Sequence, residues 1–318
     1  MFNFPHNKIC ISTFVCMNTF FICIGQDAHY SNQHENLFNL NPSCITQIKK
    51  SALNLNYRNQ WPGSSNFVTY SAALFNTFSN LKSTVGLQII RDDQGDGIIN
   101  LTGVTLLYGY QTKVSNSMSL SAGMGGAYNI YSVDLNRLTF ENNLSPVTNL
   151  NSKIDFFDFL AGLELGFFNA SWLGLSVSHI TLPQISSEFN LFRKYTFSYR
   201  GNYSLFNNYT SKKASIEPIL VTSIQRNNNE ILYGGRFNYL GYLGGLYMRN
   251  DINFKFDSFI ILLGISLKKI SFIYTYDINL SGVQSRFKKL ASHEVTFFYN
   301  LEYNSRTNKK GAIKCPKF

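Results

Sequence analysis

Residues 154–179 alternate apolar residues with polar or small ones in the period of a β-strand. Between residues 156 and 167, one set of alternate positions is entirely apolar, whereas the other set includes Asp158, Glu164 and two glycines. Successive side chains of a strand point to opposite faces, so one face is apolar and the other is mixed. The alternation resumes after residues 169–171, which predicts a long hairpin with a short turn.

The same alternation recurs along the chain and defines about fourteen candidate strands. A tilted strand needs about nine to eleven residues to cross a bilayer, and many of these segments approach that length. With apolar outer faces, they predict an all-β fold, a transmembrane antiparallel β-barrel. The candidate strands lie at residues 51–58, 66–75, 83–91, 98–113, 118–134, 154–169, 172–179, 195–206, 214–226, 229–240, 242–249, 259–267, 270–279 and 292–303.

The connections between these strands alternate in length. Those after even-numbered strands are mostly short, as at residues 115–117 and 268–269, whereas those after odd-numbered strands include the long segments 135–153, 180–194 and 280–291. Bacterial barrels have an even strand number, short periplasmic turns and longer outer loops. The asymmetry therefore favours a barrel with both termini in the periplasm over the main alternative, a soluble β-sandwich.

The composition agrees with a membrane barrel. The chain has 28 Phe and 19 Tyr but an ordinary mean hydropathy of −0.09. A barrel needs apolar residues only at alternate positions, so its average hydropathy stays moderate while its aromatic content rises. Beyond the first 25 residues, no run of eighteen apolar residues occurs, so membrane residence has to come from strands.

Four regions are expected along the chain. Residues 1–25 have a basic start, an apolar run and a small last residue, which predicts a cleaved signal peptide; an N-terminal membrane anchor is the alternative. Residues 26–50 are polar and read as a lead-in or plug segment. Residues 51–303 form the barrel, and residues 304–318 form a basic periplasmic tail.

Charge and cysteine usage narrow the function. The formal net charge is +10, but Lys and Arg are scattered over turns and the tail without a nucleic-acid motif, so no nucleic-acid partner is expected. Three of the five cysteines lie in the presumed signal peptide. Cys44 and Cys315 either pair or remain two free thiols.

No catalytic, metal or cofactor site is expected. The loop at residues 91–97 carries three carboxylates but lacks the spacing of a calcium loop, so we interpret it as an acidic turn. Ser178 with His179, and Ser292 with His293, are the only hints of a barrel-embedded hydrolase. Trp61 beside a Pro-Gly turn is interpreted equally well as a partner anchor or as an interfacial aromatic.

With these residues in view, the chain resembles the PorP/SprF family of Bacteroidota outer-membrane proteins, which is associated with type IX secretion and gliding motility. The resemblance covers nearly all of the mature chain. Asn143 departs from it, because a more acidic or glycine-bearing turn is expected there. The matching stretches include 26–27, 39–42, 57–63, 67–71, 92–97, 138–140, 156–159, 174–179, 276–277, 292–294 and 314–316.

The resemblance implies a barrel without enzymatic activity that supports export or surface attachment of specific cargo, such as a gliding adhesin. Its implied partners are secreted proteins with a C-terminal sorting domain, the periplasmic secretion or motility machinery, and outer-membrane lipid. A diffusion channel or small-molecule transporter of the same architecture remains the alternative. The candidate partner-binding residues are Arg58, Asn59, Gln60, Trp61, Pro62, Asp93, Asp96, His293 and Glu294.

Overall fold

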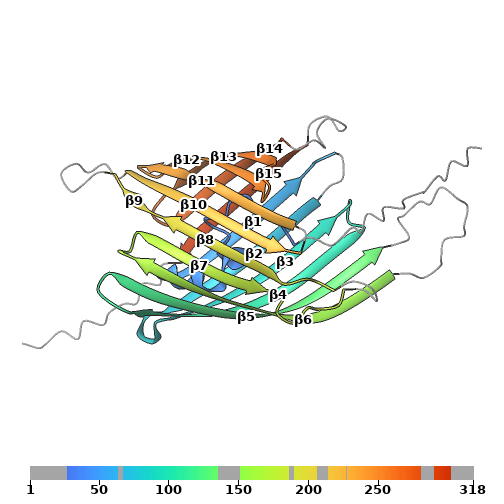
Figure 1. The fold of residues 1–318 in the computed structure, drawn as a ribbon, viewed down its shortest axis with the longest axis horizontal. Helices are drawn as coiled ribbons and strands as arrows, with labels where there is room; N and C mark the ends of the chain where they lie inside the picture. Colours follow the sequence, from blue (N-terminus) through green and yellow to red (C-terminus); the bar gives the residue numbers. More distant parts are fainter. Residues whose placement is uncertain are drawn as a thin grey trace, which may run out of the picture.

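The computed structural model describes residues 27–63, 67–134, 151–185, 190–205, 214–226, 228–280 and 290–301. These residues form one antiparallel sheet that closes on itself (Figure 1). The strands are β1 (Ser51–Gln60), β2 (Phe67–Phe78), β3 (Ser83–Gln94), β4 (Ile99–Lys113), β5 (Met118–Asp134), β6 (Asn151–Phe167), β7 (Ser171–Ser178), β8 (Lys194–Gly201), β9 (Tyr203–Ser204), β10 (Ala214–Gln225), β11 (Asn228–Tyr239), β12 (Tyr242–Asp251), β13 (Phe256–Ser266), β14 (Ile270–Asn279) and β15 (Ala291–Leu301).

The ring closes because β1 pairs with β15 as well as with β2. Every neighbouring pair is consecutive along the chain, apart from this closure and the short strand β9. β8 and β9 both pair with β10 and together occupy one place in the ring. The barrel therefore has fourteen strand positions, which confirms the predicted count and fold class.

The break between β8 and β9 was not expected, since the sequence predicts one strand over residues 195–206. Pro218 in β10 lies where the pairing is interrupted, because β8 pairs only as far as Ile219 and β9 resumes at Ile216. Proline has no backbone N–H to donate to a ladder. The missing donor accounts for the gap in this otherwise continuous pairing.

The two faces of each strand differ as the alternation predicts. In β6, Phe157 is 68% exposed and Leu163 is 55% exposed on the outer face, whereas Asp158 and Glu164 are 4% and 1% exposed on the inner face. Exposed apolar side chains occur on the outer faces of most of the other strands as well. The outer surface is thus suited to contact with lipid, and the polar residues line the lumen.

The two ends of the barrel differ. The turns after β2, β4, β6, β11 and β13 are short, and we call their side of the barrel the short-turn end. Ser51 pairs with Leu301, so β1 starts and β15 stops at this end. The opposite side is the long-loop end, although the connections after β3, β10 and β12 are also short there.

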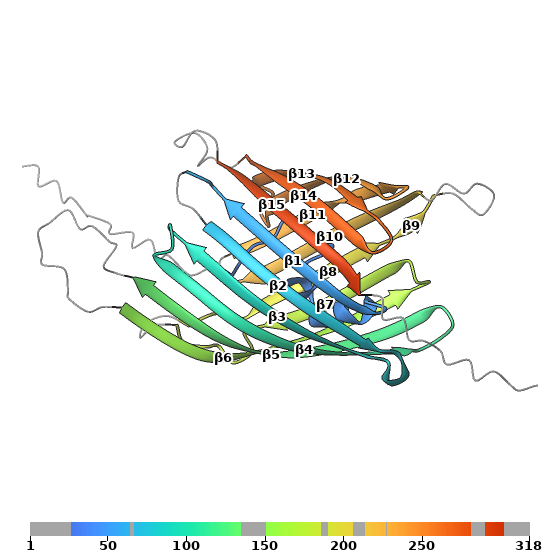
Figure 2. The ribbon, with the colours of Figure 1, turned by 180° about the vertical axis from the view of Figure 1, so that it is seen from behind.

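Residues 27–48, called the N-terminal segment below, lie inside the barrel. Figures 1 and 2 show this segment in blue between strands of opposite walls, seen from both sides. It contains a single α-helical turn, α1 (Leu37–Leu40), and a 3-10 helix, η1 (Pro42–Gln47). Cys44 and Ile45 are fully buried and pack with inward side chains such as Phe75 and Leu107 in one hydrophobic cluster. Within the described residues, no helix is long and apolar enough to cross a membrane.

The inner wall is shaped to receive this segment. Asn41 caps η1 by accepting a hydrogen bond from the Ser43 backbone N–H at 2.9 Å, and its amide donates to the Leu163 carbonyl at 3.1 Å. Gly123 in β5 leaves room for this turn, because a Cβ there would collide with the backbone of Pro42 and Ser43. The close backbone approach therefore depends on a glycine in the wall.

Replacing Gly123 with valine should push the N-terminal segment off the wall. Overpacking of this kind costs about 1–3 kcal/mol. The measurement is urea unfolding of the barrel in lipid vesicles. Gly126→Val is the control, since Gly126 lies on the outer face of the same strand and its nearest neighbour, Phe159, is 3.6 Å away. Equal losses of stability in both variants would contradict the account.

Candidate functional site

A buried network of ions fixes the start of the N-terminal segment to the wall. Arg58 in β1 is 1% exposed and forms ion pairs with Asp277 of β14 at 2.9 Å and with Glu294 of β15 at 3.3 Å. Ser31 joins the same network, because its backbone N–H donates to Glu294 and its hydroxyl donates to Asp277, both at 2.6 Å. Arg249 of β12 pairs with the same Asp277 oxygen, Oδ2, at 2.9 Å. Four strands and the segment thus share one set of charges.

A second buried ion pair contacts residues of η1. Arg200 of β8 forms an ion pair with Glu164 of β6, and the Cys44 thiol donates to the same carboxylate at 3.1 Å. Gln47 also donates its amide to Glu164. Burial raises the pKa of Cys44 well above its usual range, so the thiol stays protonated and acts as a donor. Cys44 is a free thiol, and Cys315 lies outside the described residues.

A third set of ion pairs joins the middle of the segment to β10 and β11. Arg236 of β11 forms ion pairs with Glu35 at 2.8 Å and with Glu217 of β10. The Glu35 carbonyl also accepts a hydrogen bond from Asn54 of β1 at 2.8 Å. Glu35 therefore connects two parts of the barrel that are far apart in the ring.

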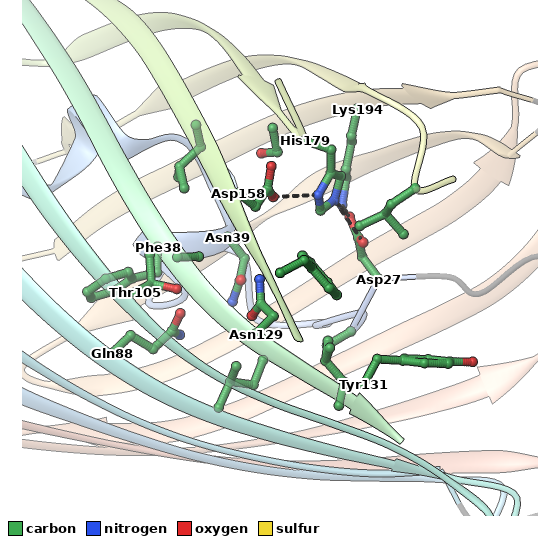
Figure 3. A pocket seen from close by; sticks show the side chains of 18 of the residues that line it. Asp27, Phe38, Asn39, Gln88, Thr105, Asn129, Tyr131, Asp158, His179 and Lys194 are labelled. Carbon is green, nitrogen blue, oxygen red and sulfur yellow. Dashed lines mark hydrogen bonds and ion pairs between the residues drawn. The ribbon is translucent and has the colours of Figure 1, made fainter. Parts of the chain in front are cut away.

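The fourth group lies at the long-loop end and is drawn in Figure 3. His179, just after β7, contacts the Asp158 carboxylate through Nδ1 at 2.7 Å and the Asp27 carboxylate through Nε2 at 3.0 Å. Lys194 reaches Asp27 at 3.5 Å. Carboxylates occupy both ring nitrogens of His179, so neither is left to accept a proton from Ser178. The arrangement fixes the N-terminal segment to the loop.

We call the contacts of His179 with Asp158 and Asp27 the His179 tether. They keep His179 and Asp27 in their charged forms. Burial lowers the pKa of His179, but the charge of Asp27 and the hydrogen bond to Asp158 outweigh burial and raise it to about 10. Burial likewise raises the pKa of Asp27, but the charges of His179 and Lys194 reverse this and hold it well below its usual range. Both groups are therefore charged near neutral pH.

This group borders a cavity of about 150 Å³ between the N-terminal segment and the wall. Figure 3 shows His179, Asp158, Asp27 and Lys194 along one part of it, with amide side chains along another. Its lining mixes amides, aromatic rings and the ionic group. These include Asn39, Gln88, Asn129, Tyr131 and Phe156.

The predicted partner-binding residues divide between two places. Arg58 and Glu294 face the lumen, where they contact the chain's own N-terminal segment. Trp61 lies at the long-loop end, half-buried, with its ring edge-to-face against Phe67 at 5.4 Å. The neighbouring Pro62 is exposed.

The remaining predicted residues lie on β1, β3 and β15 or, for Asp96, in the turn after β3. Asn59 and Gln60 are half-buried at the end of β1. Asp93 pairs with Arg91 at 3.0 Å, and Asp96 is exposed in the following turn. His293 lies beside Tyr276 and accepts or donates a 2.7 Å hydrogen bond with Tyr274. A role in binding a partner stays a prediction for all nine residues.

Several residues that organise the lumen were not singled out as a site from the sequence. Asp277, Arg200, Arg236 and Arg249 are spread over four strands. Each lies on the lumen-facing side of a strand with alternating apolar and polar residues. That alternation is the one feature of the sequence that indicates their position. Which charges meet depends on the register of strands that are distant along the chain.

The closed ring with apolar outer faces and a polar lumen defines the class of protein, a transmembrane β-barrel. The family described as "Type IX secretion system membrane protein PorP/SprF" matches residues 22–299. The chain therefore belongs to the PorP/SprF family and is an outer-membrane component of type IX secretion. The predicted family and the outer-membrane localisation are confirmed.

Other comparisons show similar architecture only. A Pseudomonas aeruginosa FadL homologue is 12% identical with a TM-score of 0.46, over 82% of this chain and 93% of that chain. The toluene transporter TodX from Pseudomonas putida is 8% identical with a TM-score of 0.44, over 86% and 94%. At such low values these likenesses carry no argument about function. No curated protein matched the chain.

Replacing Arg58 with glutamine should destabilise the barrel strongly. Removing one partner of a buried ion pair leaves uncompensated charge and costs about 3–5 kcal/mol. Arg91→Gln removes an exposed pair with Asp93 and should cost about 0–1 kcal/mol. Urea unfolding followed by tryptophan fluorescence in lipid vesicles measures both. Similar small effects would show that the Arg58 network contributes little.

The tether at His179 should depend on pH in a defined direction. The raised pKa of His179 means that its contribution is complete below about pH 6.5 and is lost as the pH rises through about 10. The lowered pKa of Asp27 means that its contribution is complete above its ordinary pKa of 3.8 and is lost as the pH falls well below that value. Between these limits the tether should hold.

A spin label at Ala28→Cys, in a Cys315→Ser background, reports on this tether. Its mobility should be low at pH 7 and should rise between about pH 9 and pH 11. His179→Gln is the control that isolates the contribution of the histidine. That variant should show a mobile label already at pH 7. A label that is immobile at every pH in both proteins would contradict the tether.

Proposed function

We propose that this PorP/SprF protein supports the export or surface attachment of specific cargo proteins, either a gliding adhesin or other cargo with a C-terminal sorting domain. Family membership supports a place in type IX secretion. The choice of a cargo role over a channel role rests on the lumen.

The occupied lumen is the observation that carries the proposal. A barrel of fourteen strand positions has room for a pore. Here the N-terminal segment occupies that room, with Leu40, Cys44 and Ile45 at most 1% exposed. Ser31 donates a hydrogen bond to Glu294, and Glu35 forms an ion pair with Arg236, so both connect the segment to the wall. A diffusion channel or small-molecule transporter needs a continuous path. An accessory that binds other proteins at its ends does not.

The two ends are suited to different partners. We infer that the short-turn end faces the periplasm, as in other bacterial barrels, and that the long-loop end faces outward. The long-loop end carries Trp61, Asp93 and Asp96, which offer aromatic and charged contacts to a secreted protein. The basic tail at residues 304–318, outside the described residues, is proposed to dock on periplasmic machinery.

Affinity purification of the tagged protein from native outer membranes tests the proposal. Mass spectrometry should identify a secreted surface protein with a C-terminal sorting domain, together with periplasmic secretion or motility components. Removal of an interface anchor often costs 2 kcal/mol or more, so Trp61→Ala should reduce cargo recovery by more than about tenfold.

Trp172→Ala is the matched control, because Trp172 is the second of the chain's two tryptophans and lies at the short-turn end. It should leave cargo recovery unchanged once barrel abundance is normalised. Recovery of the barrel alone from mild detergent, with wild-type protein, would count against a cargo role.

A further inference from the structure

A second cavity lies at the short-turn end, on the opposite side of η1 from the first. Its volume is about 460 Å³, and it is lined mainly by Thr46, Ile48 and Lys49 and by residues at or near the ends of β2, β3, β4 and β5. We call it the basic mouth pocket. Pockets that bind ligands commonly measure about 300–1,000 Å³, so this one can accept more than a single small ion.

Three lysines from separate elements meet at this pocket. Lys49 follows η1, Lys82 ends the short 3-10 helix η2 (Ser79–Leu81), and Lys113 is the last residue of β4. Lys82 has a left-handed backbone with φ of 52°. Lys113 shares the lumen-facing register of Leu107. All three side chains are exposed at the mouth.

No carboxylate lines the pocket among the residues that the structure describes. Within the described ranges, Lys49, Lys82 and Lys113 form no ion pair. The rest of the lumen is different, since Arg58, Arg200, Arg236 and Arg249 each pair with at least one carboxylate. The basic mouth pocket thus has positive charge that nothing in the described lumen balances.

The remaining lining consists mainly of hydrogen-bonding groups. Hydroxyls and amides surround the lysines, and both kinds can donate to an oxyanion. They include Thr46, Thr77, Thr84, Gln111, Asn116 and Ser117. Clustered cations with hydroxyl and amide donors are suited to carboxylates or phosphates.

The position of the pocket favours a soluble ligand over a lipid headgroup. Thr84 is 1% exposed and faces the lumen, and Thr46 and Ile48 belong to the segment inside the barrel. The outer surface nearby presents Leu81 and Tyr110, which are 66% and 42% exposed, to lipid. A ligand therefore approaches along the barrel axis from the short-turn end.

We propose that the basic mouth pocket binds an acidic peptide segment of a periplasmic protein, with its carboxylates on Lys49, Lys82 and Lys113. The volume accommodates several residues of an extended chain, and opposite charge accelerates and orients such an encounter. The proposal deepens the proposed function, because its periplasmic orientation rests on that function.

The test is fluorescence anisotropy with the purified full-length barrel in detergent. The probe is a labelled hexaglutamate peptide, and labelled hexaglutamine is its neutral counterpart. The barrel should bind hexaglutamate, with an affinity that falls as salt is added, and should not bind hexaglutamine. The triple variant K49Q/K82Q/K113Q should bind hexaglutamate at least tenfold more weakly.

The control variant K153Q/K255Q/K268Q removes the same charge from exposed lysines outside the pocket and should bind as the wild type does. Equal loss in both triple variants would overturn the site, because it would show a response to net charge alone. Displacement of the peptide by inorganic phosphate at comparable concentration would overturn the peptide assignment in favour of a simple anion site.

Phosphatidylglycerol vesicles that displace labelled hexaglutamate more strongly than unlabelled hexaglutamate does would overturn the peptide assignment in favour of a lipid ligand. The assay contains no cargo and no secretion machinery. Absence of peptide binding alongside normal cargo recovery therefore removes this inference and leaves the proposed function standing.

Discussion

The lumen depends on one interaction, the network of buried ion pairs and hydrogen bonds that joins the N-terminal segment to the barrel wall. Charged groups that leave water need partners, because an unpaired ion in a poorly solvated site is very costly. The wall supplies Arg58, Asp277 and Glu294, and Ser31 of the segment completes their hydrogen bonds. Glu35 does the same for Arg236. Segment and wall are therefore parts of one polar network.

Shape reinforces this charge pairing. Gly123 allows the backbone of the segment to lie against β5, and Cys44 and Ile45 fill the apolar part of the lumen. The segment is too short and too polar to fold alone, since α1 has four residues and η1 has six. Its helical turns exist because the wall satisfies their polar groups, as the Asn41 amide shows by donating to two strand carbonyls.

Much of the fold could be predicted from the sequence, because a period of two reports directly on which face a residue occupies. Phe157 and Asp158 lie on the faces that the alternation assigns to them. The pairing of Arg58 with Asp277 could not be predicted, since it arises from the closure of the ring through β15. The gap between β8 and β9 could not be predicted either, because it depends on the backbone N–H that Pro218 lacks in the neighbouring strand β10. The helical turns at residues 37–47 are too short to show a periodic pattern of apolar residues in the sequence.

Conductance in planar bilayers shows whether the N-terminal segment closes the lumen. The wild-type barrel should be silent at a steady holding potential, whereas a variant lacking residues 27–48 that inserts as a folded barrel should show large steady currents. A wild-type barrel that conducts as well as the deletion variant would contradict the claim and would support a channel.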